Sequence, residues 1–433
     1  ETDPVIFTSL ADDTRGGDTN GDGTGSTPGR GNWARVLMRA DSTGNSIDHA
    51  QFHYGGHFYG AMVEAEDTDL TVANSTFADS EADGLRLEGT DAIVTANVYR
   101  DNLGAAVSMD LNSNPTITGV TWSGNGINGL QVDAGVLEKN LIWDDPDIVY
   151  RLDSDITVPE GITLTIGAGQ IIKPSHANLH LLVDGTLNIN GTASDPVVFT
   201  SIADDTRGGD TNGNADGSAP GRGNWARVLM RDLSSGNTIH HAEFHYGGHF
   251  FGAMVEAQST DLTIADSTLA DSDSDGLRLE ATDAIVTDNI YRDNSSAAIS
   301  MDLNSNPTIS GSSPVNATGN GINGLQVDAG VLGKDLVWDD PDIVYRPDGS
   351  ITVPTGMTLT IDAGQIVKPA GANTHLYVDG RLNIAGTETD PVIFTSLADD
   401  TRGGDTNGDG TGSTPGRGNW ARVLMRADST GNS

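Results

Sequence analysis

Cysteine is absent from this chain of 433 residues, which excludes disulfide bonds, thiolate catalysis and cysteine-ligated zinc. Basic side chains are scarce: 23 lysines and arginines stand against 61 acidic residues, and the formal net charge is −38. Nucleic acids and anionic membrane surfaces are bound by basic faces, so neither is an expected partner. No apolar run of about 18 residues or more occurs, so we expect no membrane-spanning helix, and no charged-then-apolar leader is present.

Long internal repeats are the most prominent feature of what is present. Residues 388–433 match residues 1–46 letter for letter, and a weaker copy lies between them. Asp3 recurs as Asp195 and Asp390, which gives spacings of 192 and 195 residues, and the extra residues fall at 312–318. The pattern predicts that this chain is a segment of a longer array of tandem repeats. It divides the chain into three sequence copies, which are residues 1–192, residues 193–387 and the start of a further copy at residues 388–433.

Each copy also contains a shorter period. Phe77, Tyr99 and Trp122 recur at steps of 22 and 23 residues, and the residues around them fall into register without gaps. The residues between the apolar positions are mostly polar, and this period of two indicates strands with one buried face. The apolar sets in register are Val72, Val94 and Ile117; Leu85, Val107 and Leu130; and Leu87, Met109 and Val132.

Strict recurrence every 22–24 residues predicts an all-β fold, a parallel β-helix or β-solenoid. Short strands separated by turns are also typical of a β-sandwich, but a sandwich does not require like residues at a fixed step. We expect roughly eight coils in each sequence copy, and we expect the stack of coils to continue from one copy to the next. Ser80, Asn102 and Asn125 fall at one turn position, which predicts hydrogen bonds from coil to coil.

Four runs carry a resemblance to a known family: residues 162–174, 182–189, 195–201 and 208–213. They resemble the right-handed parallel β-helix modules of large secreted and cell-surface proteins of bacteria and archaea. The resemblance covers nearly the whole chain. It implies a right-handed coil and an extracellular or cell-surface location. Pectate-lyase-like enzymes share this fold, so the resemblance does not choose a function.

A loop rich in aspartate and glycine, residues 11–32, interrupts the coil pattern. Asp18, Asn20 and Asp22 occupy alternate positions, as oxygen ligands do in the first half of a calcium-binding loop. The glutamate expected at the twelfth position of such a loop is replaced by Gly29. Calcium is therefore the expected cofactor, and the alternative is a solvated turn closed by aspartate hydrogen bonds.

The same ligand set recurs in the later copies. Two aspartates earlier in the first loop, Asp12 and Asp13, could complete its site. The equivalent candidate calcium ligands are Asp210, Asn212, Asn214 and Asp216 in the second copy, and Asp405, Asn407 and Asp409 in the third.

A second acidic cluster also has alternate carboxylates beside a glycine. Its members are Asp79, Glu81 and Asp83 in the first copy, and Asp271, Asp273 and Asp275 in the second. These residues suit calcium, and they equally suit an exposed acidic turn.

The histidines His49, His53 and His57 recur 192 residues later. A spacing of four residues places two histidines on one face of a helix, where they bind zinc. A β-coil does not place them so. We therefore expect a stacked, aromatic-rich turn rather than a zinc site.

The repeats favour a structural function over an enzymatic one. A polysaccharide lyase or hydrolase needs a tuned group of carboxylates in one cleft, yet every candidate acid here is duplicated in the next copy. We expect an extracellular structural protein that forms a fibre, stalk or surface filament, with copies of itself along the solenoid axis as partners. An adhesin that binds glycans is the alternative. Lysine occurs at only four positions, 139, 173, 334 and 368, and this acidic balance suits a saline environment.

Overall fold

A computed structural model describes residues 3–311 and 315–433 of the chain, so part of the expected insertion, residues 312–314, lies outside the described residues. The chain divides into two compact units. Unit 1 comprises Glu1–His176 and Ser194–Pro220, and unit 2 comprises Ala177–Ala193 and Gly221–Ser433. Apart from one short 3-10 helix, η1 (Ala215–Gly217), the described secondary structure is β-strand. No helix in the described part of the chain is long and apolar enough to cross a membrane.

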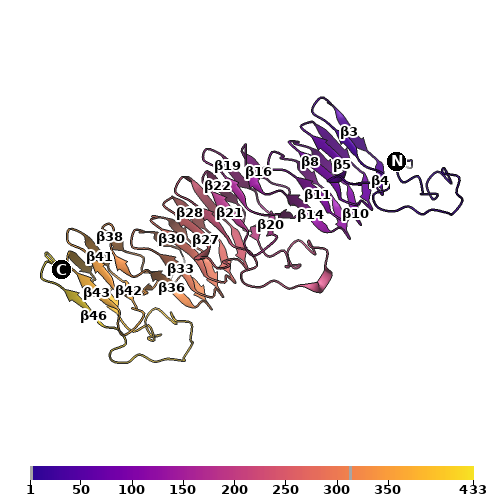
Figure 1. Cartoon of the computed structure of the whole chain (residues 1–433). Helices are drawn as coiled ribbons and strands as arrows, with labels where there is room; N and C mark the ends of the chain where they lie inside the picture. Colours follow the sequence, from indigo (N-terminus) through magenta and orange to yellow (C-terminus); the bar gives the residue numbers. More distant parts are fainter. Residues whose placement is uncertain (1–2, 312–314) are drawn as a thin grey trace. The chain divides into compact units, whose positions relative to one another are not determined.

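In unit 1 the strands pair in parallel with strands three places away in the order of the chain, as successive coils of a solenoid do (Figure 1). The first sheet contains β1 (Val5–Phe7), β4 (Ala50–His53), β7 (Thr76–Ala78), β10 (Val98–Arg100) and β13 (Thr121–Ser123). The second contains β2 (Val36–Met38), β5 (Ala61–Glu66), β8 (Asp83–Glu88), β11 (Ala105–Met109), β14 (Ile127–Val132), β17 (Tyr150–Leu152), β20 (Ile171–Pro174) and β23 (Val197–Phe199). The third contains β3 (Asn45–Asp48), β6 (Leu70–Ala73), β9 (Ile93–Thr95) and β12 (Thr116–Thr118). Two further pairs are β15 (Gly135–Val136) with β18 (Ile156–Val158), and β16 (Leu141–Trp143) with β19 (Thr163–Ile166).

Unit 2 follows the same parallel scheme. Its longest run of paired strands is β21 (His180–Val183), β24 (Arg227–Met230), β27 (Ala253–Gln258), β30 (Asp275–Glu280), β33 (Ala297–Met301), β36 (Ile322–Val327), β39 (Tyr345–Pro347), β42 (Ile366–Val367) and β45 (Ile393–Phe394). A second run contains β22 (Thr186–Asn190), β25 (Asn237–His240), β28 (Leu262–Ala265), β31 (Ile285–Thr287) and β34 (Thr308–Ser310). A third contains β26 (Ala242–His245), β29 (Thr268–Ala270), β32 (Ile290–Arg292) and β35 (Asn316–Thr318). The last two are β37 (Gly330–Val331), β40 (Ile351–Val353), β43 (His375–Val378) and β46 (Arg422–Met425), and β38 (Leu336–Trp338), β41 (Thr358–Asp362) and β44 (Arg381–Ala385).

The register expected from the short period is confirmed. Tyr99 is paired with Phe77 on one side and with Trp122 on the other. The rings of Phe77 and Tyr99 stack with centroids 5.0 Å apart. The other apolar sets pair in the same way, with Val94 between Val72 and Ile117. Equivalent residues of successive coils therefore lie one above the next, as in a parallel β-solenoid.

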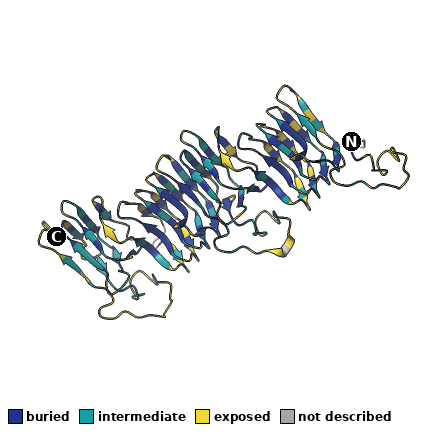
Figure 2. Ribbon diagram, in the orientation of Figure 1, coloured by how far each residue is buried: buried dark blue, intermediate teal, exposed yellow. Residues whose placement is uncertain are grey.

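The core of each unit is the column enclosed by its sheets, and many residues of the strands around it are buried (Figure 2). Alternate residues of a strand point inward, so an apolar side chain at every second position fills the column. Polar turn residues are buried as well. The Asn102 side chain donates to the Phe77 carbonyl oxygen, and its Oδ1 accepts from the Ser80 amide, which confirms the coil-to-coil hydrogen bonds expected at this position.

The stack continues across the boundaries between sequence copies. In unit 1, β20 of the first copy pairs with β23 of the second. In unit 2, β43 of the second copy pairs with β46 of the third. Strand pairing therefore passes from one copy to the next inside a single compact unit.

Equivalent strands of consecutive copies fall in different sheets. β24 and β46 have the same sequence, Arg-Val-Leu-Met, and each pairs with the equivalent preceding strand, β21 or β43. β24 nevertheless belongs to the sheet that continues to β45, whereas β46 belongs to the sheet of β37, β40 and β43. The strands from β24 to β45 number 22 at three to a coil, so one copy advances by just over seven coils. This is slightly fewer than the roughly eight expected, because the long acidic loop takes residues out of the coils.

Candidate metal sites

The first acidic loop gathers three carboxylates in unit 1. Carboxylate oxygens of Asp13, Asp18 and Asp22 all lie within 4.8 Å of one another. The loop folds around Asp18, whose two oxygens accept hydrogen bonds from the amides of Gly21 at 2.7 Å and Gly23 at 2.8 Å. Backbone amides thus fix the position of one carboxylate, and the other two converge on it.

Asp13 joins this group, and Asp12 does not. Asp13 Oδ1 is shielded from solvent and has no hydrogen-bond partner. Loss of hydration raises the pKa of Asp13, and the charges of Asp18 and Asp22 raise it further. The carboxylate of Asp12 instead accepts from the hydroxyl of Thr8, at 2.6 Å, and from that of Thr14. An unpartnered carboxylate oxygen beside two other carboxylates fits a hard cation such as calcium.

The third copy repeats the arrangement in unit 2. Oxygens of Asp400, Asp405 and Asp409 lie within 4.8 Å of one another. Asp400 Oδ1 again has no hydrogen-bond partner, and neither has Asn407 Oδ1. The Asn407 amide donates to Asp409 Oδ2 at 2.9 Å, which leaves its carbonyl oxygen available as a ligand.

The second copy differs at one ligand. Asn214 occupies the place of the third aspartate, and its amide donates to Ser218 Oγ at 2.8 Å. Asp210 accepts from the amides of Asn214 and Ala215, at 3.1 and 2.8 Å. Within the described side chains this loop, which contains η1, gathers no group of three carboxylates; the side chain of Asp216 is not described.

A buried lysine anchors each of the two later loops. Lys173 on β20 is fully buried, and its Nζ donates to the carbonyl oxygens of Asp204 and Gly209 and to Thr211 Oγ1, at 2.8 to 2.9 Å. Burial lowers the pKa of Lys173 to about 8. In unit 2, Lys368 makes the equivalent bonds to Gly404 and Thr406, and burial lowers its pKa too.

Sequence reasoning did not identify these anchors. The signal was present, because two of only four lysines stand inside otherwise apolar strand segments. A lysine is almost never fully buried unless its ammonium group is paired.

The structure does not bring the second acidic cluster together. Glu81 Oε2 lies 2.7 Å from His57 Nδ1, whereas Asp79 Oδ2 lies 3.6 Å from His53 Nδ1. Asp83 accepts from the Ala105 amide at 2.6 Å, and burial raises its pKa. The three carboxylates have separate partners, and they are not among the groups of converging carboxylates in the described part of the chain.

The equivalent residues of the second copy are separated in the same way. Asp271 Oδ2 lies 3.8 Å from His245 Nδ1, and Asp273 is exposed. Asp275 is buried and accepts from the Ala297 amide at 2.8 Å. The three acids therefore do not share one set of contacts.

A third group of carboxylates was not expected from the sequence. Oxygens of Glu64, Glu66 and Glu88 lie within 4.8 Å of one another on the outer face of β5 and β8. Arg35 forms an ion pair with Glu64, and its Nη1 lies 3.8 Å from Glu66. The alternation of Glu64 and Glu66 along one strand was the available signal.

The acidic run Asp144, Asp145 and Asp147 after Trp143 suggests a solvated turn, yet Asp145 and its counterpart in the second copy, Asp340, are buried. Both are 2% exposed. Asp145 accepts from the Ile117 amide at 2.6 Å and from the Tyr150 hydroxyl at 2.9 Å. Burial raises the pKa of each aspartate to about 6. The carboxylates tie neighbouring coils together and do not face solvent.

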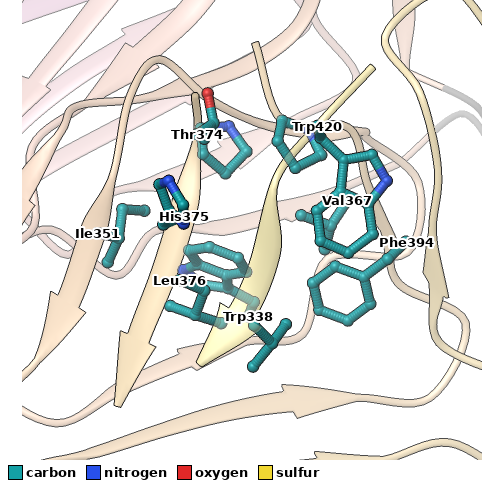
Figure 3. Close-up of a pocket in the computed structure, with 11 residues that line it drawn as sticks. Trp338, Ile351, Val367, Thr374, His375, Leu376, Phe394 and Trp420 are labelled. Atoms are coloured by element: carbon teal, nitrogen blue, oxygen red, sulfur yellow. The ribbon is translucent and has the colours of Figure 1, made fainter. Parts of the chain in front are cut away.

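An apolar pocket in unit 2 offers no room for a ligand. It lies among Trp338, His375, Phe394 and Trp420 (Figure 3). Its free volume of about 20 Å³ holds no more than a single water molecule. We therefore place the candidate functional groups on the loops and turns.

Two family models match the chain. One, described as a right handed beta helix region, matches residues 35–142 and 227–330. The other, described as a pectate-lyase like beta helix domain, matches residues 135–250 and 330–409. No curated protein and no solved structure gives a significant match. The two models and the parallel stacking together identify the chain as one built of right-handed β-helix repeats.

Proposed function

We propose that this chain is part of an extracellular structural protein in which stacked β-helix copies build a fibre, stalk or surface filament. The observation that carries the proposal is the strand pairing across the copy boundaries, from β20 to β23 and from β43 to β46. A further copy then adds coils to the existing stack without a new interface. Exposed strand edges are templates for pairing, so copies in one chain or in neighbouring chains can extend it.

Calcium is the second part of the proposal. The acidic loops supply carboxylate oxygens from Asp13, Asp18 and Asp22, and from Asp400, Asp405 and Asp409. Calcium takes oxygen ligands at 2.3–2.6 Å and tolerates irregular geometry, which suits a loop of this kind. A bound ion would offset the repulsion among the carboxylates in a chain of net charge −38. We propose that calcium orders the loops, and that a saline extracellular setting supplies the ion.

A polysaccharide lyase or hydrolase is the less favoured alternative. The name of one matching family model refers to pectate lyases. Against this, the best-placed arginines are held in ion pairs: Arg86 binds Asp133 and Glu88, and Arg278 binds their counterparts in the second copy. Release of unsaturated or reducing ends from acidic polysaccharides would establish this alternative.

Chains of different length test the structural proposal. We would compare the native chain with chains that carry one and two additional 387-residue repeats, each combining the two sequence copies, by electron microscopy of single particles. One 192- or 195-residue copy of just over seven coils should add about 35 Å of length at a rise of about 4.8 Å per coil, so each 387-residue repeat should add about 70 Å. Particles that grow in all directions, or separate globules, would contradict the proposal.

A further inference from the structure

Each of the two complete turn regions places a phenylalanine at its tip, just before β5 and β27. Phe58 is 88% exposed and Phe250 is 85% exposed. Both have positive φ angles, 61° and 55°. A bulky residue rarely adopts this conformation, and the strain costs about 1–3 kcal/mol. Glycine would avoid that cost, yet both copies keep an aromatic ring that the fold hardly buries.

In unit 1 the exposed ring lies beside a histidine that contacts a carboxylate. The His57 and Phe58 ring centroids are 3.7 Å apart, and His57 Nδ1 lies 2.7 Å from Glu81 Oε2. Gly31 lies close to Glu81, since a Cβ atom added at Gly31 would be 2.1 Å from Glu81 Oε2. Arg30, which precedes Gly31 in the chain, donates to the Asp101 carbonyl oxygen at 2.6 and 3.1 Å, in the turn two coils further on. The exposed ring thus lies against an imidazole that contacts a carboxylate.

Unit 2 carries the same combination. The His249 and Phe250 ring centroids are 3.9 Å apart. A Cβ atom at Gly223 would lie 3.0 Å from His249 Nδ1 and 3.1 Å from Asp273 Oδ2. Arg222 Nη1 donates to Ser295 Oγ at 3.2 Å. The arrangement therefore occurs twice, with aspartate in place of glutamate.

We propose that each turn tip binds a pyranose ring of a neutral polysaccharide. The C–H face of a sugar ring is apolar and packs on an aromatic ring, while its hydroxyl groups bond to donors and acceptors at the ring's edge. This ligand has the amphipathic character that the phenylalanine and its polar neighbours match. The inference goes beyond the structural function proposed above and does not depend on it.

Other occupants fit less well. A protein interface needs at least about 1,000 Å² of buried surface with an apolar centre. The exposed Leu103 is replaced by Ser295 at the equivalent turn position of the second copy, so the second copy does not keep an apolar patch. An acidic polymer is disfavoured by the net charge of −38.

Affinity electrophoresis tests the proposal directly. We would run the full chain in native gels that contain a β-glucan, a galactomannan or a xylan, with polygalacturonate as the acidic probe. The native chain should be retarded by at least one neutral polymer, and the variant with both Phe58→Ala and Phe250→Ala should lose at least tenfold in affinity. Phe58→Trp in the Phe250→Ala background should retain binding at one tip.

Matched controls separate this site from general exposure of apolar groups. Leu10→Ala and Leu233→Ala remove exposed leucines, 68% and 57% accessible, that lie outside the turn tips, and should leave retardation unchanged. Absence of retardation of the native chain in all three neutral polymers would overturn the proposal. So would self-association in ultracentrifugation that the double alanine variant abolishes. A failure here would leave the length measurements untouched.

Discussion

The first and second acidic loops, residues 11–32 and 203–224, differ at four positions, and the exchange of Asp22 for Asn214 shows what holds each loop together. Asp22 in the first loop accepts the Ser26 hydroxyl and adds a third carboxylate to the group with Asp13 and Asp18. Asn214 in the second loop instead donates to Ser218, and the described side chains of that loop gather no group of three carboxylates. Both loops contain four aspartates, so the loops differ in how the carboxylates are placed and not in how many there are. We propose that a cation completes the loops that gather three carboxylates.

The largest effect should follow from removing the lysine anchors, which the second and third loops share. Lys173→Met or Lys368→Met leaves at least two buried oxygens without a donor and should lower the free energy of unfolding by about 3–5 kcal/mol. Urea denaturation measures the change. Lys334→Met is the control, because Lys334 is exposed and pairs only with Asp283 in the described structure, and it should cost less than about 1 kcal/mol. Equal losses at Lys334 and Lys368 would contradict the anchoring role.

Exchange of the differing ligand should convert one loop type into the other. Calorimetric titration of the native chain should detect two calcium sites, because two loops gather three carboxylates. Asp22→Asn together with Asp409→Asn should weaken both sites by tenfold or more, and Asn214→Asp should create a third. At a calcium concentration about 100 times the Kd, a site adds about 2.7 kcal/mol to the free energy of unfolding. If neither calcium nor chelator changed the melting temperature of the native chain, the proposed calcium sites in the acidic loops would be contradicted.

The buried acids of the stack give a pH dependence that is independent of the loops. The pKa of Asp145 and of Asp340 is raised to about 6, whereas an unfolded aspartate titrates near about 3.9. Each therefore stabilises the fold fully below about pH 4 and loses that contribution, about 3 kcal/mol, as the pH rises through 6. Asp145→Asn with Asp340→Asn should flatten unfolding free energies measured between pH 4 and 7 in chelator. An unchanged pH profile would mean that these carboxylates are hydrated.

The smallest effect is expected from the second acidic cluster. Asp79→Asn and Asp271→Asn should change calcium affinity by less than twofold, because these carboxylates lie beside histidines and not beside other acids. The same titration used for the loops measures this. A loss of one binding site in either variant would show that the turn gathers its acids around the ion.

The pairing of strands could be predicted from the sequence because each coil has to bury its apolar side chains against the coils on either side. Tyr99 must cover Phe77 and be covered by Trp122, so like residues recur at a fixed step and the register follows. The placement of consecutive copies in different sheets could not be foreseen. It depends on the number of strands in a copy, and the long loop hides how many residues belong to coils.

The loops and turns were predicted less completely, for a reason that the acids illustrate. Alternation places side chains on one face only in an extended strand, and Asp79, Glu81 and Asp83 span a turn into β8. The burial of Asp145 could not be predicted, because it depends on a partner far away in sequence, the amide of Ile117. Within the first loop, spacing suggested Asp18 and Asp22. The choice of Asp13 over Asp12 depended on the nearby threonines.

The continuity of the stack across a copy boundary can be tested with a single pair of substitutions. Tyr377 on β43 and Leu424 on β46 are partners across the boundary at residues 387 and 388, and the chain has no cysteine of its own. Partner Cα atoms of paired strands lie about 4.8 Å apart, within the range of a disulfide bond. The variant Tyr377→Cys with Leu424→Cys should therefore crosslink under mild oxidation, whereas Tyr377→Cys with Arg422→Cys, about 8 Å apart by the same spacings, should not. A crosslink in the second variant and none in the first would contradict the account.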